Sequence, residues 1–192
     1  MKLESSPRAL LDANVLYPAP LRDLLLWMGV TRSYQPRWSD AIFEEWSRNL
    51  LLNRPDLRPE QLEYTYARMN AAFPEGRVLG YAARLGTLHL PDAQDRHVLA
   101  AALESRSSLI VSFNLKDFPP AALEPLGVIA MHPDAFVLSR LEAVPAAVGR
   151  ALEKMRKNLV QPPMSAEDVL GVLEQQGLAQ TVAQFRALEV AF

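Results

Sequence analysis

Short apolar runs that alternate with helical segments constrain this chain more than any other feature of its sequence. Three runs, at 8–12, 108–113 and 127–131, are strand-like in composition and too short for helices. The segments between them carry apolar residues at helical spacing, with proline or glycine near their ends. Apolar strands that alternate with helices are typical of a parallel sheet covered on both faces. The sequence therefore predicts an α/β fold with a central, mainly parallel sheet.

The helices expected from this spacing fall into two groups. Before residue 132 they cover 21–30, 38–52, 60–73, 78–85, 93–106 and a short turn at 121–124, and Ser39 is expected to cap the second of them. After residue 132 no strand is expected, and four helices cover 133–141, 144–159, 165–176 and 178–188. We therefore expect an α/β domain over 1–132 and an all-α C-terminal extension over 133–192.

The composition excludes several classes of protein. With 49% apolar and 22% charged residues among 192, the chain has the content of a globular protein rather than a disordered one. The absence of cysteine excludes disulfides, thiolate zinc sites and a cysteine nucleophile, and it suits a reducing cytoplasm. The start of the chain carries no export signal, and no apolar run approaches the roughly 18 residues of a membrane span. We expect a cytoplasmic protein that has no membrane partner.

Polar residues follow two of the expected strands at the point where each strand ends. Asp12 follows the first run, and Asn114 and Asp117 follow the second. Ligands of open parallel sheets bind outside the carboxyl ends of the strands, so these residues are expected to meet at one edge. Each of them alone also fits turn chemistry, since Asp and Asn side chains stabilise turns. Their coincidence at one sheet edge favours a binding site.

Two further acids stand before the helix expected over 93–106. Asp92 and Asp95 have the three-residue spacing of a helix cap, which also suits the helix dipole. Asp95, however, stands in i, i+4 and i+7 relation to Leu99 and Ala102, which places it on the buried side of the helix. A carboxylate there needs a partner, such as a metal ion. We therefore expect Asp92 to cap the helix and Asp95 to take part in the chemistry of the site.

Helical geometry separates the adjacent acids Glu44 and Glu45. At about 100° per residue, the apolar stripe of this helix centres on Ile42 and Trp46. Glu44 falls almost opposite the stripe and should be solvated, whereas Glu45 lies at its flank. If either acid enters a site, we expect it to be Glu45.

The acids expected at the site all offer oxygen ligands and are expected to lie close together. They are Asp12, Glu45, Asp95 and Asp117, with Asn14, Asp92, Ser112 and Asn114 close by. An all-oxygen donor set suits Mg²⁺ or Mn²⁺. Carboxylates this close repel one another unless a cation neutralises them. Such a site can activate water for attack on a phosphodiester and stabilise the charge on the leaving oxygen.

Four segments in this order resemble the PIN-domain ribonucleases. They are Leu10-Leu11-Asp12-Ala13-Asn14-Val15-Leu16, Ile42-x-x-Glu45-x-x-x-Asn49-Leu50, Asp92-x-x-Asp95-Arg96-His97-Val98-Leu99 and Ile110-Val111-Ser112-x-Asn114-Leu115-Lys116-Asp117-Phe118. More narrowly, the chain is similar to VapC-type toxins of bacterial type II toxin–antitoxin pairs, in the branch with a helical C-terminal extension. The resemblance implies a three-layer α/β/α fold and Mg²⁺- or Mn²⁺-dependent endonucleolytic cleavage of RNA by metal-activated water.

The resemblance also implies roles for single residues. The four acids named above match the metal-binding and catalytic acids of the family, and Asn14 and Ser112 match polar residues that support them. Asn114 stands where the family often has Asp. The fourth metal ligand is therefore either Asn114 or Asp117.

RNA is the expected substrate, and the net charge of −2 limits how the chain can hold it. A nucleic acid must then be bound through a metal ion or a local basic patch. Candidates near the proposed edge are Arg37, Arg48, Arg96 and Lys116, whereas the basic residues within 150–157 are expected to form a solvated helix face. The resemblance further implies a cognate antitoxin protein that covers the acidic site, and a homodimer.

Two alternatives remain beside the nuclease. Asn114 and the helical extension also suit a catalytically weak PIN scaffold that binds RNA or a protein partner. A phosphatase with Asp12 as nucleophile is disfavoured, because no second acid follows closely enough to serve as the general acid. His97, two residues after Asp95, is expected on a different helix face, as a structural residue or a substrate contact.

Overall fold

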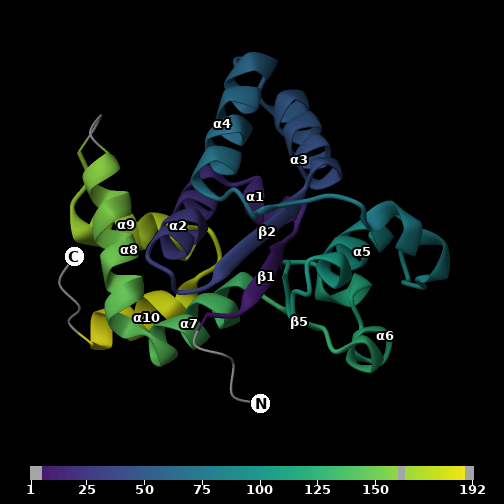
Figure 1. Ribbon diagram of the computed structural model, residues 1–192. Helices are drawn as coiled ribbons and strands as arrows, with labels where there is room; N and C mark the ends of the chain where they lie inside the picture. The colour runs from purple at the N-terminus through teal and green to yellow at the C-terminus, as the bar shows by residue number, and fades with distance from the viewer. Residues whose placement is uncertain (1–5, 160–162, 189–192) are drawn as a thin grey trace.

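The computed structural model describes residues 6–159 and 163–188 and shows a five-stranded sheet flanked by helices (Figure 1). The strand order is β3-β2-β1-β4-β5, and every neighbouring pair is parallel. The strands are β1 (Arg8–Leu11), β2 (Gln35–Ser39), β3 (Arg77–Val78), β4 (Leu109–Val111) and β5 (Ile129–Met131). The prediction of an α/β fold with a parallel sheet is confirmed.

The central strand β1 brings the first acidic residue to a change in strand order. Ala9, Leu10 and Leu11 are fully buried, because β2 and β4 pair with β1 on its two sides. The chain adds β2 and β3 on one side of β1 and then β4 and β5 on the other. The strand order therefore reverses between β1 and β4. Ligands of open parallel sheets bind at such a reversal, outside the carboxyl ends of the strands.

Helices lie on both faces of the sheet. In Figure 1, α2 and α5 lie on opposite sides of β1 and β2, as right-handed crossovers require. The helix α5 packs against β1, β2 and β4, and α2 contacts β2. The helices of this part are α1 (Ala13–Leu16), α2 (Ala19–Val30), α3 (Asp40–Asn53), α4 (Pro59–Ala72), α5 (Arg96–Glu104) and α6 (Pro120–Leu123). Three 3₁₀ turns join them, namely η1 (Tyr81–Thr87), η2 (Leu115–Asp117) and η3 (Glu124–Leu126).

The strand β2 corrects the expectation that a helix begins at Trp38. Trp38 and Ser39 end β2, and α3 begins at Asp40 with Ser39 as its N-cap. Pro36 and Arg37 interrupt the apolar pattern of this segment, so periodicity gave no strand signal. The extended conformation comes instead from parallel pairing with β1. Tertiary pairing therefore overrides the local pattern here.

Two other boundaries differ from the expectation. Val78, expected in a helix over 78–85, belongs to the two-residue strand β3, and the 3₁₀ turn η1 follows it. The helix expected over 93–106 begins only at Arg96. The turn before it is held by Asp92, whose Oδ1 accepts a hydrogen bond from the Gln94 N–H at 2.8 Å.

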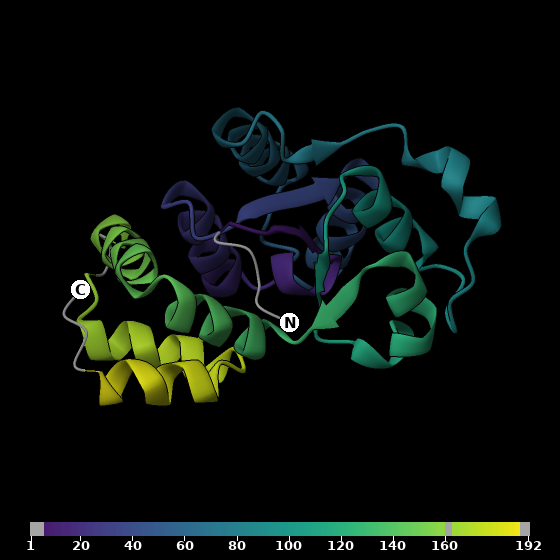
Figure 2. The ribbon, with the colours of Figure 1, turned by 60° about the horizontal axis from the view of Figure 1, so that its bottom comes forward.

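The C-terminal part forms a group of helices beside the sheet (Figure 2). They are α7 (Pro133–Ala143), α8 (Pro145–Asn158), α9 (Ala166–Gln175) and α10 (Ala179–Ala187), which confirms the four expected helices. The helix α8 packs on α2, and α10 packs on α7 and α9. The division at residue 132 stays a prediction, and its outer ends at 1 and 192 lie outside the described residues. Among the described helices, none has the length and apolar character to cross a membrane.

Candidate active site

Asp12 lies directly after β1, where it caps the short helix α1 in place of the expected turn. Its carboxylate is buried at 4% exposure. Oδ1 accepts a hydrogen bond from the Ala13 N–H at 2.7 Å, and Oδ2 accepts bonds from Asn14 Nδ2 and Ser112 Oγ, each at 2.7 Å. Three donors therefore hold the carboxylate in one orientation at the C-terminal edge of the sheet.

Asn14 and Ser112 join the ends of β1 and β4 around Asp12. Asn14 Nδ2 also donates to Ser112 Oγ at 2.9 Å, and Asn14 Oδ1 accepts from the Phe113 N–H at 3.0 Å. Ser112 Oγ accepts from the Asn114 N–H at 3.0 Å. The Ser112 hydroxyl thus donates one bond and accepts two, which is its full capacity. Both residues lie where the predicted supporting role requires them.

The other predicted acids line a polar cavity of about 670 Å³. Glu45 comes from α3, Asp95 caps α5, and Asp117 lies in η2. The cavity is lined by Ala41, Glu44, Glu45, Arg48, Asn49, Asp92, Gln94, Asp95, His97, Asn114 and Asp117. Three elements far apart in the sequence thus bring carboxylates to one depression.

Crowding of these acids is clearest at Asp95. Its pKa is raised to about 6, first by burial and then by the charges of Asp12, Asp117, Asp92 and Glu45. This effect also places Asp12 within electrostatic range of the cavity, although Asp12 does not line it. Four neighbouring carboxylates therefore oppose the ionisation of Asp95.

Two opposing effects act on the pKa of the Asp12 carboxyl. Burial raises the pKa of its carboxyl most, and Glu45 adds to the increase. The hydrogen bonds from Ser112 and Ala13 and the proximity of His97 lower the pKa, but burial outweighs them. The donors and the positive charge near Asp12 therefore do not offset the cost of ionising it.

The donor chemistry of the cavity fits a hard divalent cation. The predicted ligands are carboxylate and amide oxygens, and their mutual repulsion would fall if a cation bound among them. Within residues 6–159 and 163–188, no three His, Asp or Glu side chains are placed to hold a metal ion as they stand. Mg²⁺ does not require such a cage, because it usually keeps several waters and binds one or two carboxylates together with substrate phosphate.

Asn114 and Asp117, the two candidates for the fourth ligand, contact each other. Asn114 Nδ2 donates a hydrogen bond to Asp117 Oδ2. Both residues line the cavity. The geometry therefore keeps both beside the site, and the choice between them stays a prediction.

The exposure of Glu44 and Glu45 agrees with their predicted positions on the helix. Glu44 is exposed at the outer wall of the cavity, and Glu45 is partly buried. Asp92 is exposed and stabilises the turn before α5, but the N-cap position of that helix is Asp95, so the assignment of helix capping to Asp92 is wrong. The structure places all three acids at the cavity, at different depths.

Among the basic residues expected near this edge, Arg48 lines the cavity. Arg96 and Lys116 stand beside it in sequence but do not line it. Arg37 is a correction, because it lies in β2, is bonded to the Pro36 carbonyl at 2.9 Å and lines a separate cavity. Its position follows from the unpredicted strand.

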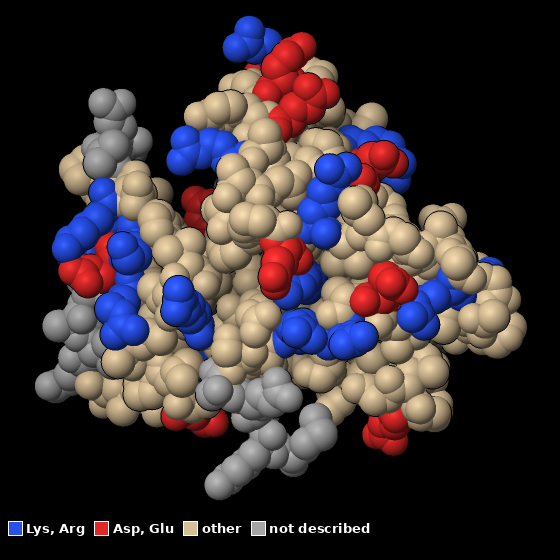
Figure 3. All heavy atoms as spheres, viewed as in Figure 1, with Lys and Arg blue, Asp and Glu red and all other residues tan. Residues whose placement is uncertain are grey.

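The basic residues of the extension are remote from this edge. Arg150, Lys154 and Lys157 are exposed on α8. Figure 3 shows basic side chains gathered with an acid on the α8 side of the molecule. Lys157 Nζ pairs with Glu153 Oε1 at 2.5 Å. The face is therefore solvated and partly neutralised, as expected.

His97 is a site residue that sequence reasoning misplaced. Its Nε2 lies 3.4 Å from Glu45 Oε2, and it lines the same cavity as Asp95. Asp95 is the N-cap of α5 and lies outside the helix, so the helical angle that should separate the two residues does not apply. A predicted start of α5 at Arg96 would have allowed Asp95 and His97 to lie at the same cavity.

Comparisons with known proteins give a family model and a curated relative. Residues 133–187 match a family model described as the VapC50 C-terminal domain. A protein of Mycobacterium tuberculosis (strain ATCC 25618 / H37Rv) named "Putative ribonuclease VapC50" is 39% identical over 95 residues, or 50% of this chain and 56% of the relative. The chain thus matches about half the length of that curated relative. No solved structure matches the chain.

Proposed function

The chain is a PIN-domain protein of the VapC type with a C-terminal extension, and from this premise we propose that it is a Mg²⁺- or Mn²⁺-dependent endoribonuclease. Its biological role would be that of the toxin in a bacterial type II toxin–antitoxin pair. The observation that carries the proposal is the gathering of carboxylates at the reversal of strand order, where burial and four other acids raise the pKa of Asp95 to about 6.

The cation would be held by oxygens from five residues. These are Asp12, Glu45, Asp95, Asp117 and Asn114. When bound, Mg²⁺ or Mn²⁺ supplies the positive charge that activates water and offsets the negative charge of a phosphodiester. The donor set and its uncompensated charge support this assignment.

The chain's own groups prepare the site for a phosphodiester. Asn14 and Ser112 fix the Asp12 carboxylate, so it does not reorganise when substrate arrives. His97 contacts Glu45 and orients it toward the cavity. Arg48 in the cavity wall, with Arg96 and Lys116 nearby, supplies positive charge for the RNA backbone.

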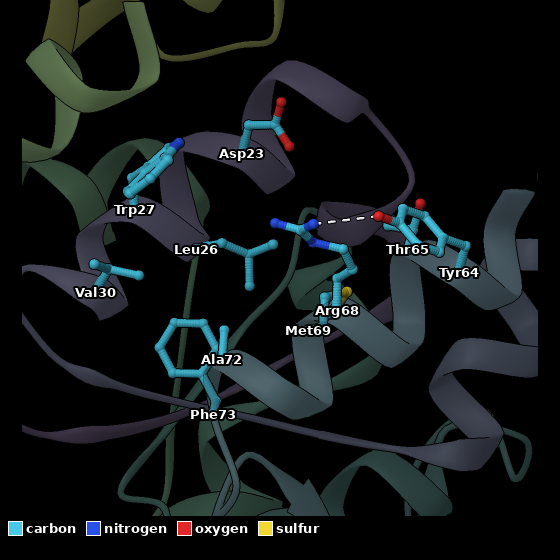
Figure 4. Close-up of a pocket in the computed structure, with 10 residues that line it drawn as sticks. All are labelled: Asp23, Leu26, Trp27, Val30, Tyr64, Thr65, Arg68, Met69, Ala72 and Phe73. Atoms are coloured by element: carbon cyan, nitrogen blue, oxygen red, sulfur yellow. Dashed lines mark hydrogen bonds between the residues drawn. The ribbon is translucent and has the colours of Figure 1, made fainter. Parts of the chain in front are cut away.

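An apolar groove between α2 and α4 supports a protein partner for this fold. The groove has a volume of about 370 Å³, and Arg68 reaches from α4 towards α2 within it (Figure 4). Val30 and Tyr64 at its rim are 45% and 63% exposed. We infer that an antitoxin covers such apolar surface as well as the acidic cavity. A homodimer stays a prediction.

The test is RNA cleavage by the purified full chain. Total cellular RNA is incubated with Mn²⁺ or Mg²⁺, with chelator, and with the variants Asp12→Asn and Asp23→Asn. Asp23 is a matched control, because burial raises its pKa too but it lines the α2–α4 groove. We expect discrete fragments that require the metal, persist in Asp23→Asn and fall at least about 100-fold in Asp12→Asn. Equal cleavage by Asp12→Asn would overturn the proposal.

A catalytically weak scaffold is the second candidate function. It is favoured by the absence of a ready-made metal cluster among the described residues, and by Asn114 where the family often has Asp. A scaffold would retain RNA or a protein partner without cutting RNA in any metal condition. A gel shift of RNA that stays intact distinguishes it from the nuclease.

A further inference from the structure

We propose that a recess beside the acidic cavity, lined by Tyr17, Asn49 and Asn53, binds a nucleobase of the RNA next to the scissile phosphodiester. This inference rests on the proposed nuclease function and names the part of the chain that selects the cut site. The recess has a volume of about 320 Å³ and is lined by Ala13, Asn14, Tyr17, Glu45, Trp46, Asn49 and Asn53. That volume is at the lower end for ligand pockets, which suits one base rather than a longer segment.

The recess adjoins the acidic cavity directly. Glu45 and Asn49 line both depressions, so they form the wall between them. Asn14, which holds the Asp12 carboxylate, lines the recess from the other side. A strand whose phosphate lies among the acids therefore has the recess as the adjacent place for a base.

The residues that line the recess suit a nucleobase rather than a phosphate. Among the described residues that line it, Glu45 is the one charged side chain and none is Lys or Arg, so a phosphate would meet net repulsion there. Asn side chains offer paired donors and acceptors for a base edge. Tyr17 is a partly exposed ring, the kind of surface on which unpaired RNA bases stack.

Some polar groups of the recess form hydrogen bonds with one another, and others have no partner among the described residues. Asn53 Nδ2 donates to Tyr17 Oη at 3.2 Å, which links α3 to the residue that follows α1. Asn53 Nδ2 also donates to the Asn49 carbonyl within α3 at 3.1 Å. The exposed Asn49 amide forms no hydrogen bond with any described residue. The Trp46 indole Nε1 at the inner wall is buried and also without a partner in the described chain. The exposed Asn49 amide is therefore a free polar group that an entering base can reach.

The first experiment measures base preference at the cut site. The full chain cleaves a single-stranded RNA pool with randomised positions, and sequencing of the fragment ends gives the base preference at each flanking position. We expect one flanking position to show a preference of at least about tenfold, which Tyr17→Ala and Asn53→Ala reduce to nearly none. Asn53 is exposed, so its truncation leaves the core intact if Tyr17→Ala fails to fold.

Asn158→Ala is the matched control. Asn158 is also exposed near a helix end, and its Nδ2 donates to the carbonyl four residues earlier, at 2.8 Å from Lys154 O. Its removal should leave the base preference unchanged. A wild-type protein without preference, or a preference that survives both recess variants, overturns the inference.

A second experiment separates this inference from the nuclease proposal. Fluorescein-labelled pentanucleotides of A, C, G and U are titrated in chelator and followed by anisotropy, which requires no cleavage. We expect one oligonucleotide to bind at least about tenfold more tightly than another, and Asn53→Ala, but not Asn158→Ala, to remove the difference. Equal binding of all four by the wild-type chain rejects the recess, whether or not RNA is cut. Selective binding without any cleavage rejects the nuclease and keeps the recess.

Discussion

At Asp95, burial and four neighbouring carboxylates act against ionisation, and the pKa rises from 3.8 to about 6. At Asp12, hydrogen bonds from Ser112 and Ala13 act in favour of ionisation, yet burial still raises its pKa. Ionisation of either residue is therefore unfavourable in the cation-free chain. Function at such a site comes at the expense of stability, because the acids needed for binding repel one another when nothing is bound.

Asp95→Asn should stabilise the cation-free protein at neutral pH. The raised pKa means that the folded state favours the protonated acid, so folding stability falls as the pH rises from about 4 through 6. A shift of about two pKa units corresponds to about 3 kcal/mol at most, and partial exposure reduces this to about 1 kcal/mol. Thermal unfolding in chelator should show a Tm gain of about 2–4 °C at pH 7.5 that narrows toward pH 5. A variant less stable than wild type at pH 7.5 would contradict the assignment.

Ser112→Ala should weaken both stability and cation binding. Ser112 is fully buried, donates to Asp12 and accepts from Asn14 and the Asn114 N–H. Its loss leaves buried groups unpaired, at a cost of about 1–3 kcal/mol, and frees the Asp12 carboxylate, with about 10–100-fold weaker metal affinity. Urea unfolding and a Mn²⁺ titration measure the two effects. Ser139→Ala, which removes a hydroxyl bond of 2.7 Å to a carbonyl within α7, should leave Mn²⁺ affinity unchanged.

At the scale of elements, β1 and β4 were predictable because continuous apolar residues precede a polar end. The strand β2 was not, since Pro36 and Arg37 break its pattern and pairing with β1 supplies its conformation. Asp12 follows from the sheet edge and Glu45 from its helix face, whereas Asp95 reaches the cavity from the N-cap position outside α5, which its helical spacing did not predict. His97 was misplaced because the start of α5 lies three residues later than its composition suggests.

The contact between α7 and α10 offers a prediction about local unfolding. Asp134 is 4% exposed and accepts bonds from the Gln180 N–H at 2.9 Å, the Thr181 N–H at 2.8 Å and Thr181 Oγ1 at 2.7 Å. Asp134→Ala should cost about 3 kcal/mol and accelerate hydrogen exchange in α10 before it affects the sheet. Asp168→Ala, an exposed capping change, should cost about 1 kcal/mol. Unchanged exchange in α10 would show that other contacts hold the helix.

At the scale of the whole molecule, the extension and the sheet domain depend on each other. The helix α8 packs on α2, whose Leu21, Leu24, Leu25 and Met28 are fully buried. The acidic cavity lies away from this interface, among α3, α5 and η2. The extension therefore stabilises the fold without entering the site.

Removal of residues 133–192 should expose the α8-facing side of α2. We expect the 1–132 chain to aggregate or to unfold at a Tm at least about 10 °C lower, since several buried apolar side chains lose their cover. Size-exclusion chromatography and thermal unfolding measure this. A monomeric 1–132 chain with the wild-type Tm would show that the sheet domain folds independently of the extension.

We expect the carboxylates at the reversal of strand order to hold a divalent cation, and a calorimetric titration with Mn²⁺ measures this binding without RNA. The wild-type chain should bind Mn²⁺ at pH 7.5 and more weakly at pH 5, where Asp95 is largely protonated. Asp12→Asn should weaken binding at pH 7.5 at least about tenfold, and Asp23→Asn should not. A wild-type protein that binds no Mn²⁺ at either pH would contradict the account.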